Sequence, residues 1–305
     1  MAAYGTILLL IALGRLFAAG RVLPENAADT LNRVVIVLCL PALIFIHVPT
    51  LEPSWDLLPL VFIPWLLLAL TVVMVLLAAR AFGFSRPVTA VLLVLIPLGN
   101  TSFLGFPLIE ALLGADKVRF AVVYDQFGSF LIVCTHVLFV LAWYGDGPAP
   151  SAGTIARRIV TFPPFVALVG ALLLGNAWFP DWLDALVQAF ADMLLPLVTL
   201  AVGLQLKLRL VPEYRWPLVF GLAGKLIVLP AAALAMALVA GVGSPILDVA
   251  VLESAMPPMI TAAALASSAR LAPPLASAMV AWGVLFSAAT VPFWRWAAAL
   301  AGQGT

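Results

Sequence analysis

The sequence predicts an all-α, polytopic membrane protein in which ten transmembrane helices form two inverted five-helix repeats. Three observations lead to this prediction. The 305 residues are 65% hydrophobic and only 10% charged, with a mean hydropathy of +1.18, a composition that soluble globular domains do not have. Short polar loops separate the apolar residues into ten segments. Two of these segments are interrupted near their middle by glycine, asparagine and proline.

The ten segments each have the length that a bilayer requires, about 20 mostly apolar residues. The predicted spans cover residues 3–20, 31–48, 57–80, 88–113, 118–143, 159–177, 183–204, 216–240, 246–270 and 274–300. The first ends in small residues, as a secretory signal does. Because it lacks a basic n-region and contains Arg15, we interpret it as a spanning helix and keep the signal peptide as the alternative.

Basic residues orient these spans. Alternate loops carry Arg21, Arg33, Arg80, Arg86, Arg157, Arg158, Lys207, Arg209, Arg215 and Arg270. The opposite loops carry Glu52, Asp56, Asp181, Asp184 and Asp248, with Lys117 and Arg119 as basic exceptions. The positive-inside rule then places the first set in the cytoplasm and both termini on the outer, periplasmic side.

The segment 147–158 is the one linker rich in proline, glycine and serine, and it divides the chain into halves 1–146 and 159–305. Five spans per half is an odd number, so the halves have opposite topology, as in many secondary transporters. Two matches between the halves indicate the repeat. Pro41 and Pro196 lie 155 positions apart, and the same offset aligns Ser102 with Pro257.

The two interruptions are the main indication of function. GNTSFLGFP covers 99–107 and ESAMPP covers 253–258. A helix in lipid must satisfy its backbone groups internally, so such sequences survive only where protein or a polar cavity covers them. Transporters build substrate sites from interrupted helices near the bilayer midplane. A packing kink without a ligand is the alternative.

Three consecutive polar side chains, Asn100, Thr101 and Ser102, coincide with the first interruption, and Thr261 follows Pro258 in the second. A half-helix that starts at an interruption has free amide groups at its N-terminus, which attract anions. If the two interruptions meet, two such ends converge. We therefore expect a carboxylate-bearing solute.

Ionisable residues within spans are costly and are usually functional. Asp125 is four residues before Ser129 and next to Gln126, so it shares a helix face with the serine; snorkelling to the outer loop is the alternative. Glu253 begins the second interruption. Lys225 is expected to be a counter-charge for one of these carboxylates, in either a coupling role or a structural ion pair.

The remaining polar residues in spans leave several alternatives open. Asp192 follows Gln188 by one turn and serves as a dimer contact, a packing residue or a site residue. His47 is expected at the interface, and His136 is expected to titrate near neutrality. Neither histidine has partners at metal-ligand spacing, and Cys39 and Cys134 are predicted to be small buried hydrophobic residues that form neither a disulfide nor a catalytic pair.

Motifs that are typical of other classes of function are absent from the sequence. The sequence contains no nucleophile elbow, zinc motif or phosphate loop, and its near-zero net charge gives no indication of nucleic-acid binding. We expect no cofactor, no metal and no enzymatic activity. A membrane-embedded enzyme and a non-transporting receptor are the rivals from other classes.

Several motifs resemble the auxin efflux carrier family, which includes plant PIN-type carriers and bacterial relatives described as malonate or malate transporters. They are LNRVVIVLCLPALIF, GNTSFLGFPLIEALLG, VVYDQFGSF, KLIVLP and ESAMPPMITAAALA. The resemblance implies a fold like that of sodium/bile acid symporters and sodium/proton antiporters. Spans 1, 2, 6 and 7 would form a dimerising scaffold. Spans 3–5 and 8–10 would form a transport domain, in which spans 4 and 9 cross.

The resemblance also implies an elevator mechanism and organic-anion substrates. By position, Asn100 and Thr101 belong to the first crossover, Pro257 and Pro258 to the second, and Gln126 and Ser129 to the substrate-facing part of the fifth span. We thus expect a homodimeric secondary transporter of mono- or dicarboxylates in the bacterial cytoplasmic membrane, with proton coupling as a hypothesis. A sodium-coupled symporter or a sodium/proton antiporter of the same fold is the alternative.

Overall fold

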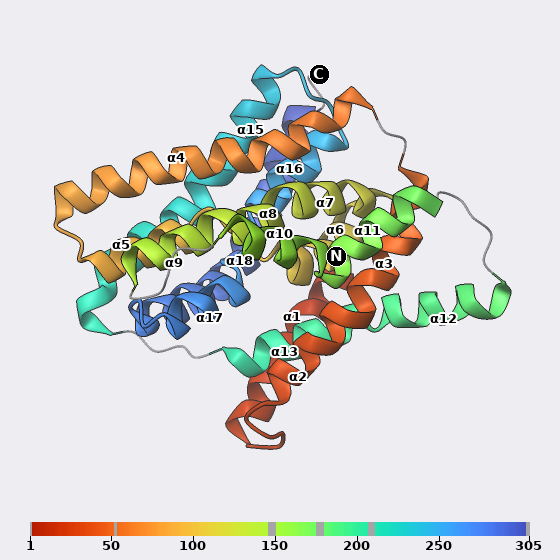
Figure 1. The fold of residues 1–305 in the computed structure, drawn as a ribbon, viewed down its shortest axis with the longest axis horizontal. Coiled ribbons are helices and arrows are strands. Elements are labelled where there is room, and N and C mark those ends of the chain that lie inside the picture. The colour runs from red at the N-terminus through yellow and green to blue at the C-terminus, as the bar shows by residue number, and fades with distance from the viewer. Residues whose placement is uncertain (1, 52–53, 146–150, 175–179, 207–210, 303–305) are drawn as a thin grey trace. The chain divides into compact units, whose positions relative to one another are not determined.

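The computed structural model describes residues 2–51, 54–145, 151–174, 180–206 and 211–302, with side chains from residue 5 onward (Figure 1). All regular elements in these ranges are helical, apart from one isolated antiparallel bridge between Gly99 and Pro258. Of the predicted linker, residues 147–150 lie outside the described ranges, and most of the remainder belongs to helix α10.

Internal contacts divide the chain into two units, and each is described by itself. Unit 1 consists of Met1–Ser54, Ser102–Val122 and Ala156–Leu206. Unit 2 consists of Trp55–Thr101, Val123–Ile155 and Lys207–Thr305.

In the described residues, the helices of unit 1 are α1 (Ala2–Ala19), α2 (Ala27–Val34), α3 (Leu40–His47), α6 (Phe106–Leu113), α11 (Pro163–Leu174), α12 (Asp181–Asp192) and α13 (Leu194–Gln205). Two more, α7 (Val118–Tyr124) and α10 (Ala152–Val160), are shared with unit 2. Within unit 1, α13 packs against α1 and α2, and α3 packs against α11 and α12.

The helices of unit 2 over its described part are α4 (Leu58–Phe82), α5 (Arg86–Leu95), α8 (Phe130–Ile132), α9 (Leu138–Tyr144), α14 (Arg215–Ala223), α15 (Leu229–Val239), α16 (Ile246–Ser254), α17 (Ile260–Ser268) and α18 (Pro273–Gly302). Helix α18 packs against α16 and α17, and α4 packs against α5, α15 and α16. Residues Val88–Ile96 and Leu247–Met256 are buried throughout, so most of α5 and α16 lies in the core of this unit.

Six continuous helical stretches in the described residues are long and apolar enough to cross a membrane. They are Ala27–Thr50, Trp55–Phe82, Ala115–Tyr144, Asp181–Gln205, Pro212–Val239 and Pro273–Gly302. Helices α10 and α11 meet at a bend of 63°, and they form a seventh span if the two together cross the membrane once. The predicted spans 3–20, 88–113 and 246–270 coincide with shorter helices, so the ten-span count stays a prediction.

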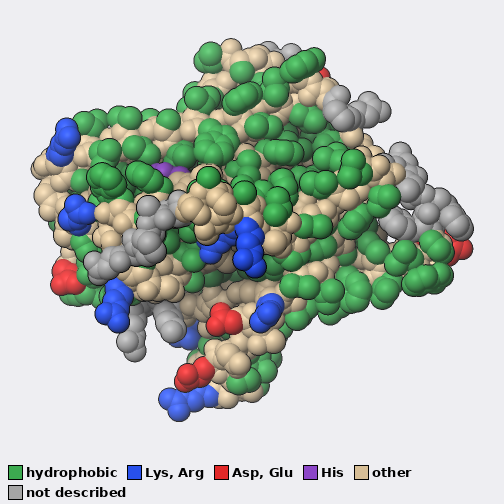
Figure 2. Space-filling view, viewed as in Figure 1, with side chains coloured by type: hydrophobic (Ala, Val, Ile, Leu, Met, Phe, Trp, Pro, Cys, Tyr) green, Lys and Arg blue, Asp and Glu red, His purple; other side chains and the backbone are tan. Residues whose placement is uncertain are grey.

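Hydrophobic side chains are spread widely over the face shown in Figure 2, and charged side chains are few there. Large apolar residues are strongly exposed in both units, among them Leu9 and Leu173 in unit 1 and Val239 in unit 2. In water such a surface would aggregate. The chain is therefore a multi-pass membrane protein.

Three of the helical segments contain a π-helical turn shortly before a proline. The turns Val35–Cys39, Thr101–Gly105 and Gly224–Val228 each end two residues before a proline, namely Pro41, Pro107 and Pro230. A proline lacks the amide hydrogen and clashes with the carbonyl four residues earlier. A local π turn changes the hydrogen-bond register there and lets the helix continue without a break.

Helices α1 and α13 approach most closely at Gly14 and Gly203. A Cβ atom at Gly203 would collide with the carbonyl oxygen of Ile11 and the Cα atom of Gly14. Small residues allow such close backbone contact between helices in a membrane.

We predict that Gly203→Val destabilises the protein by about 1–3 kcal/mol, because the added side chain forces these two helices apart. Thermal unfolding in detergent measures the effect. Gly5→Val is the matched control, since a Cβ at Gly5 of α1 meets nothing within 4 Å. Equal unfolding temperatures for the two variants would contradict the proposed close contact.

Candidate functional site

The two interrupted segments pair with each other inside unit 2. The amide of Asn100 donates to the Pro257 carbonyl at 2.8 Å, and the amide of Met259 donates to the Leu98 carbonyl at 3.0 Å. Gly99 and Pro258 form the antiparallel bridge between these two bonds. The residues on either side of Pro258 make both hydrogen bonds. The pairing therefore does not need the amide hydrogen that proline lacks.

The pairing leaves little space for a side chain at Gly99. A Cβ atom there would lie 3.1 Å from the Glu253 carbonyl oxygen, 3.1 Å from Lys225 Nζ and 3.2 Å from Met256 Cβ. Helix α18 packs against the opposite segment, where a Cβ at Gly283 would collide with the ring of Pro258. Close packing around the bridge therefore requires glycine at position 283 and favours it at position 99.

Lys225 stabilises the end of α16. Its side chain is fully buried, and Nζ donates to the Ser254 carbonyl at 3.0 Å. The last carbonyls of a helix lack partners within the helix and favour a positive charge. The ammonium group thus supplies a partner where the interruption begins.

Lys225 was predicted to be a counter-charge for a buried carboxylate, and it interacts with Glu253 without direct contact. The ammonium group and the Glu253 carboxylate interact electrostatically, but among the described residues they form no ion pair. The hydrogen bond goes to the backbone instead.

Glu253 lies in the last turn of α16 with no exposed surface. Neither of its carboxylate oxygens has a hydrogen-bond partner in the described part of the chain. Asp125 and Lys225 are close enough to interact with it electrostatically. An unpartnered buried carboxylate is costly in a membrane. Glu253 is therefore a candidate for binding a proton or a cation.

Asp125 connects the first interruption to the π-helical turn Asp125–Ser129. Its Oδ1 accepts a hydrogen bond from Thr101 Oγ1 at 2.5 Å, and its Oδ2 accepts one from Gln126 Nε2 at 2.7 Å. Asp125 is 1% exposed. The alternative that it snorkels to the outer loop is therefore wrong, because its carboxylate is held inside by Thr101 and Gln126.

The same π-helical turn is fixed from α4. Trp65 Nε1 donates to the Phe127 carbonyl at 3.0 Å, and a Cβ at Gly128 would collide with the ring of Pro64. Ser129, a predicted site residue, is buried at the end of this turn. These contacts hold the polar side chains of the turn in place.

Besides the Glu253 oxygens, two buried polar atoms in this region have no partner among the described residues, the Nδ2 donor of Asn100 and the Oε1 acceptor of Gln126. Because Gln126 Nε2 faces a carboxylate, which only accepts, Oε1 must point the other way. The first amides of α17 also lack partners within the helix, and Thr261 lies half-buried there. This arrangement provides hydrogen-bond donors suited to an anion.

Two groups of predicted site residues lie within unit 2, one at each of the paired interruptions. The first group is Asn100, Thr101, Asp125 and Gln126, and the second is Lys225, Glu253, Pro257 and Pro258. Ser102 is half-buried in the next π-helical turn and belongs to unit 1. Within the described residues, no group of three or more His, Cys, Asp or Glu is placed to hold a metal ion.

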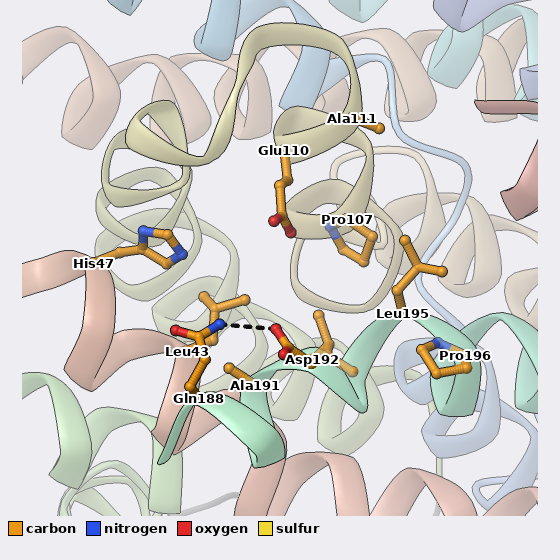
Figure 3. Close-up of a pocket in the computed structure, with 11 residues that line it drawn as sticks. Leu43, His47, Pro107, Glu110, Ala111, Gln188, Ala191, Asp192, Leu195 and Pro196 are labelled. Atoms are coloured by element: carbon orange, nitrogen blue, oxygen red, sulfur yellow. Dashed lines mark hydrogen bonds between the residues drawn. The ribbon is translucent and has the colours of Figure 1, made fainter. Parts of the chain in front are cut away.

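Unit 1 contains a separate pocket of about 470 Å³ (Figure 3). Its lining residues are Leu43, His47, Pro107, Glu110, Ala111, Gln188, Ala191, Asp192, Leu194, Leu195 and Pro196. Gln188 Nε2 donates to Asp192 Oδ1 at 2.8 Å. Sequence reasoning did not single out Glu110, although an acidic residue in the apolar run FPLIEALL is itself a signal of function.

Comparisons with known proteins identify the class and then the family. The family model described as "Membrane transport protein" matches residues 2–295, so the chain is a multi-pass membrane transporter. It belongs to the membrane transport protein family, which is the auxin efflux carrier family. The resemblance inferred from the motifs is thereby confirmed.

Two archaeal proteins are similar over nearly their whole length. An "Uncharacterized transporter" of Methanothermobacter thermautotrophicus is 29% identical over 297 residues, which cover 95% of this chain and 95% of that protein. A second, of Methanocaldococcus jannaschii, is 22% identical over 302 residues, which cover 95% and 96% of the two chains. Both are named as transporters, in agreement with the family.

We predict that Lys225→Met lowers the free energy of unfolding by about 1–3 kcal/mol, since it leaves the buried Ser254 carbonyl without its donor. Denaturant titration in detergent micelles measures this loss. Lys117→Met is the control, because Lys117 pairs with Asp116 at an exposed position, where an ion pair contributes about 0–1 kcal/mol.

The double variant Lys225→Met/Glu253→Gln tests whether the two charges are coupled. We expect it to be less destabilised than the sum of the single variants, because removing the carboxylate charge removes the need for the ammonium group. Strictly additive effects would show that Lys225 acts through the Ser254 carbonyl alone.

Proposed function

We propose that the protein is a secondary transporter of small organic anions, mono- or dicarboxylates, and that it works by elevator-type alternating access. The observation that carries the proposal is the paired interruption of unit 2, with the unpartnered donor of Asn100 beside it. An anion bound there would accept hydrogen bonds from Asn100 and from the first amides of α17. Thr101, Asp125 and Gln126 would hold the first segment in position.

The donor set favours a carboxylate over a cation as the transported solute. Amide groups at a helix N-terminus carry a partial positive charge, and Lys225 adds a full one nearby. Asp125 contributes a negative charge, but its two oxygens already accept hydrogen bonds from Thr101 and Gln126. The donors proposed for the anion are therefore Asn100 Nδ2 and the first amides of α17, whereas Gln126 Oε1 and the Glu253 oxygens are acceptors and would not contact it.

The division into two units supports the elevator mechanism. Unit 2 contains α4, α5, α9 and α14–α18, which fall in predicted spans 3–5 and 8–10. Unit 1 contains α1–α3 and α11–α13, which fall in spans 1, 2, 6 and 7. We propose that unit 2 carries the substrate and that unit 1 is the scaffold and forms a homodimer. Ser102–Val122, which groups with unit 1, departs from the simple scheme.

We further propose that transport is coupled to protons and that the protein lies in the bacterial cytoplasmic membrane with both termini outside. The unpartnered oxygens of Glu253 support proton binding. The same observation supports the alternative, a sodium-coupled symporter or a sodium/proton antiporter of this fold. An assay with and without sodium distinguishes the two.

We predict that Asn100→Ala lowers carboxylate uptake into proteoliposomes by about tenfold or more, because one charge-assisted hydrogen bond is lost. Initial rates with radiolabelled malonate, malate and acetate measure the effect. Asn26→Ala is the matched control, since Asn26 is exposed in unit 1. Unchanged rates for every carboxylate that wild type transports would contradict the proposed binding residue.

Proton coupling predicts that an inward proton gradient accelerates uptake by wild type and that Glu253→Gln removes this acceleration. The amide of glutamine keeps the shape of the side chain but does not exchange a proton in this pH range. The uptake rate is measured at two imposed gradients with the sodium concentration held constant. A response to the gradient that persists in Glu253→Gln would exclude this residue as the coupling site.

A further inference from the structure

Three prolines of unit 2 leave a buried backbone carbonyl without its usual donor. In an α-helix the carbonyl of each residue accepts a hydrogen bond from the amide four residues later, and proline has no amide hydrogen. A buried carbonyl without a donor is costly in an apolar surrounding. Three buried residues stand four positions before a proline in this way: Leu93 before Pro97, Leu226 before Pro230 and Ser254 before Pro258.

A side chain from another helix replaces the missing amide at each of these three prolines. The donors are an imidazole, an indole and an ammonium group, so the replacement does not depend on one residue type. The bonds join His136 Nε2 to the Leu93 carbonyl at 3.1 Å, Trp294 Nε1 to the Leu226 carbonyl at 2.8 Å and Lys225 Nζ to the Ser254 carbonyl at 3.0 Å.

The bond from His136 has a defined polarity. A carbonyl oxygen only accepts, so Nε2 of His136 carries the hydrogen. His136 lies in the π-helical turn Val133–Val137, and α9, which follows this turn, packs against α5. The imidazole therefore bonds to α5 from the fifth predicted span.

The carbonyl that His136 satisfies lies directly before the first interruption. Leu93 is in the last turn of α5, which ends at Leu95. From there the chain continues to Leu98 and Asn100, which pair with the second interruption. The bond from His136 thus fixes the end of the helix from which the paired segment starts.

The fifth span holds the first interruption at two points. Asp125 and His136 lie on the same continuous helical stretch, Ala115–Tyr144. Asp125 accepts a hydrogen bond from Thr101, just after the pairing, and His136 bonds to Leu93, just before it. A segment fixed at both ends keeps the residues between them in place, and these include Asn100.

We propose that His136 is a positioning residue for the proposed carboxylate site, and that it acts through the Leu93 carbonyl that Pro97 leaves without an amide. His136 does not contact the solute. It fixes the end of α5 and thereby the place of Asn100. The effect on transport rests on the proposed function, whereas the hydrogen bond itself does not.

The test supplies the missing amide by mutation. His136→Leu removes the donor, and Pro97→Ala adds a backbone amide in its place. We expect His136→Leu to raise KM about tenfold for a carboxylate that wild type transports into proteoliposomes, because the unsatisfied carbonyl lets the end of α5 shift. In the double variant we expect KM to return to within about threefold of that of Pro97→Ala alone. His136→Gln keeps an N–H donor and should retain the wild-type KM.

A second donor and proline provide the matched control. Trp294→Phe removes the indole N–H, and we expect Pro230→Ala to reverse its effect on the unfolding temperature in detergent. Pro230→Ala should not reverse the effect of His136→Leu. Equal reversal of His136→Leu by Pro97→Ala and by Pro230→Ala would overturn the proposal. A KM left unchanged by His136→Leu would also overturn it.

Thermal unfolding of the same variants needs no transported solute, so it separates this proposal from failure of the proposed function. Additive effects of His136→Leu and Pro97→Ala on the unfolding temperature would overturn the proposal, whatever the transport result. Coupled effects in a protein that takes up no carboxylate would support the hydrogen bond and contradict the proposed function. If His136→Leu does not fold, we expect Pro97→Ala, and not Pro230→Ala, to restore folded protein; restoration by neither would overturn the proposal.

Discussion

The structure of unit 2 depends on one constraint, that backbone groups released from a helix inside an apolar core must find partners. The two interrupted segments satisfy it by pairing with each other through the Asn100–Pro257 and Met259–Leu98 hydrogen bonds. Gly99 allows the close approach, and Pro258 occupies a position where the pairing needs no amide hydrogen. Each interruption thus stabilises the other.

Side chains complete this arrangement and separate structural groups from free ones. Lys225 satisfies the carbonyl of Ser254, and Thr101 and Gln126 satisfy Asp125. What remains after these bonds is a donor on Asn100, an acceptor on Gln126 and the carboxylate of Glu253. Buried polar groups are retained without partners mainly where function needs them. This contrast underlies the assignment of roles within the candidate site.

The sequence predicted the features that depend on local residue type. Clusters of glycine, asparagine and proline predicted both interruptions, and the apolar content predicted a helical membrane protein. The family followed from motifs around these same clusters, and the family match confirmed it. The number of spans stays a prediction, because several predicted spans coincide with bent or short helices, for which length alone does not decide.

Contacts between distant residues were beyond sequence reasoning. Nothing in the sequence indicates that the Lys225 ammonium bonds to the Ser254 carbonyl instead of a carboxylate, or that Thr101 reaches Asp125. The snorkelling alternative for Asp125 failed for the same reason. The pocket around Glu110 and Asp192 combines three chain segments, so only the fold brings its residues together. Side-chain partners of this kind depend on packing, which single-sequence patterns do not encode.

The most direct measurement of the central claim is an experimental structure of the protein with a bound carboxylate. The account predicts that the chain is unwound at Gly99 and Pro258 and that the carboxylate lies within hydrogen-bond distance of Asn100 Nδ2 and the first amides of α17. Continuous helices through these two positions, or a carboxylate bound away from both, would contradict it.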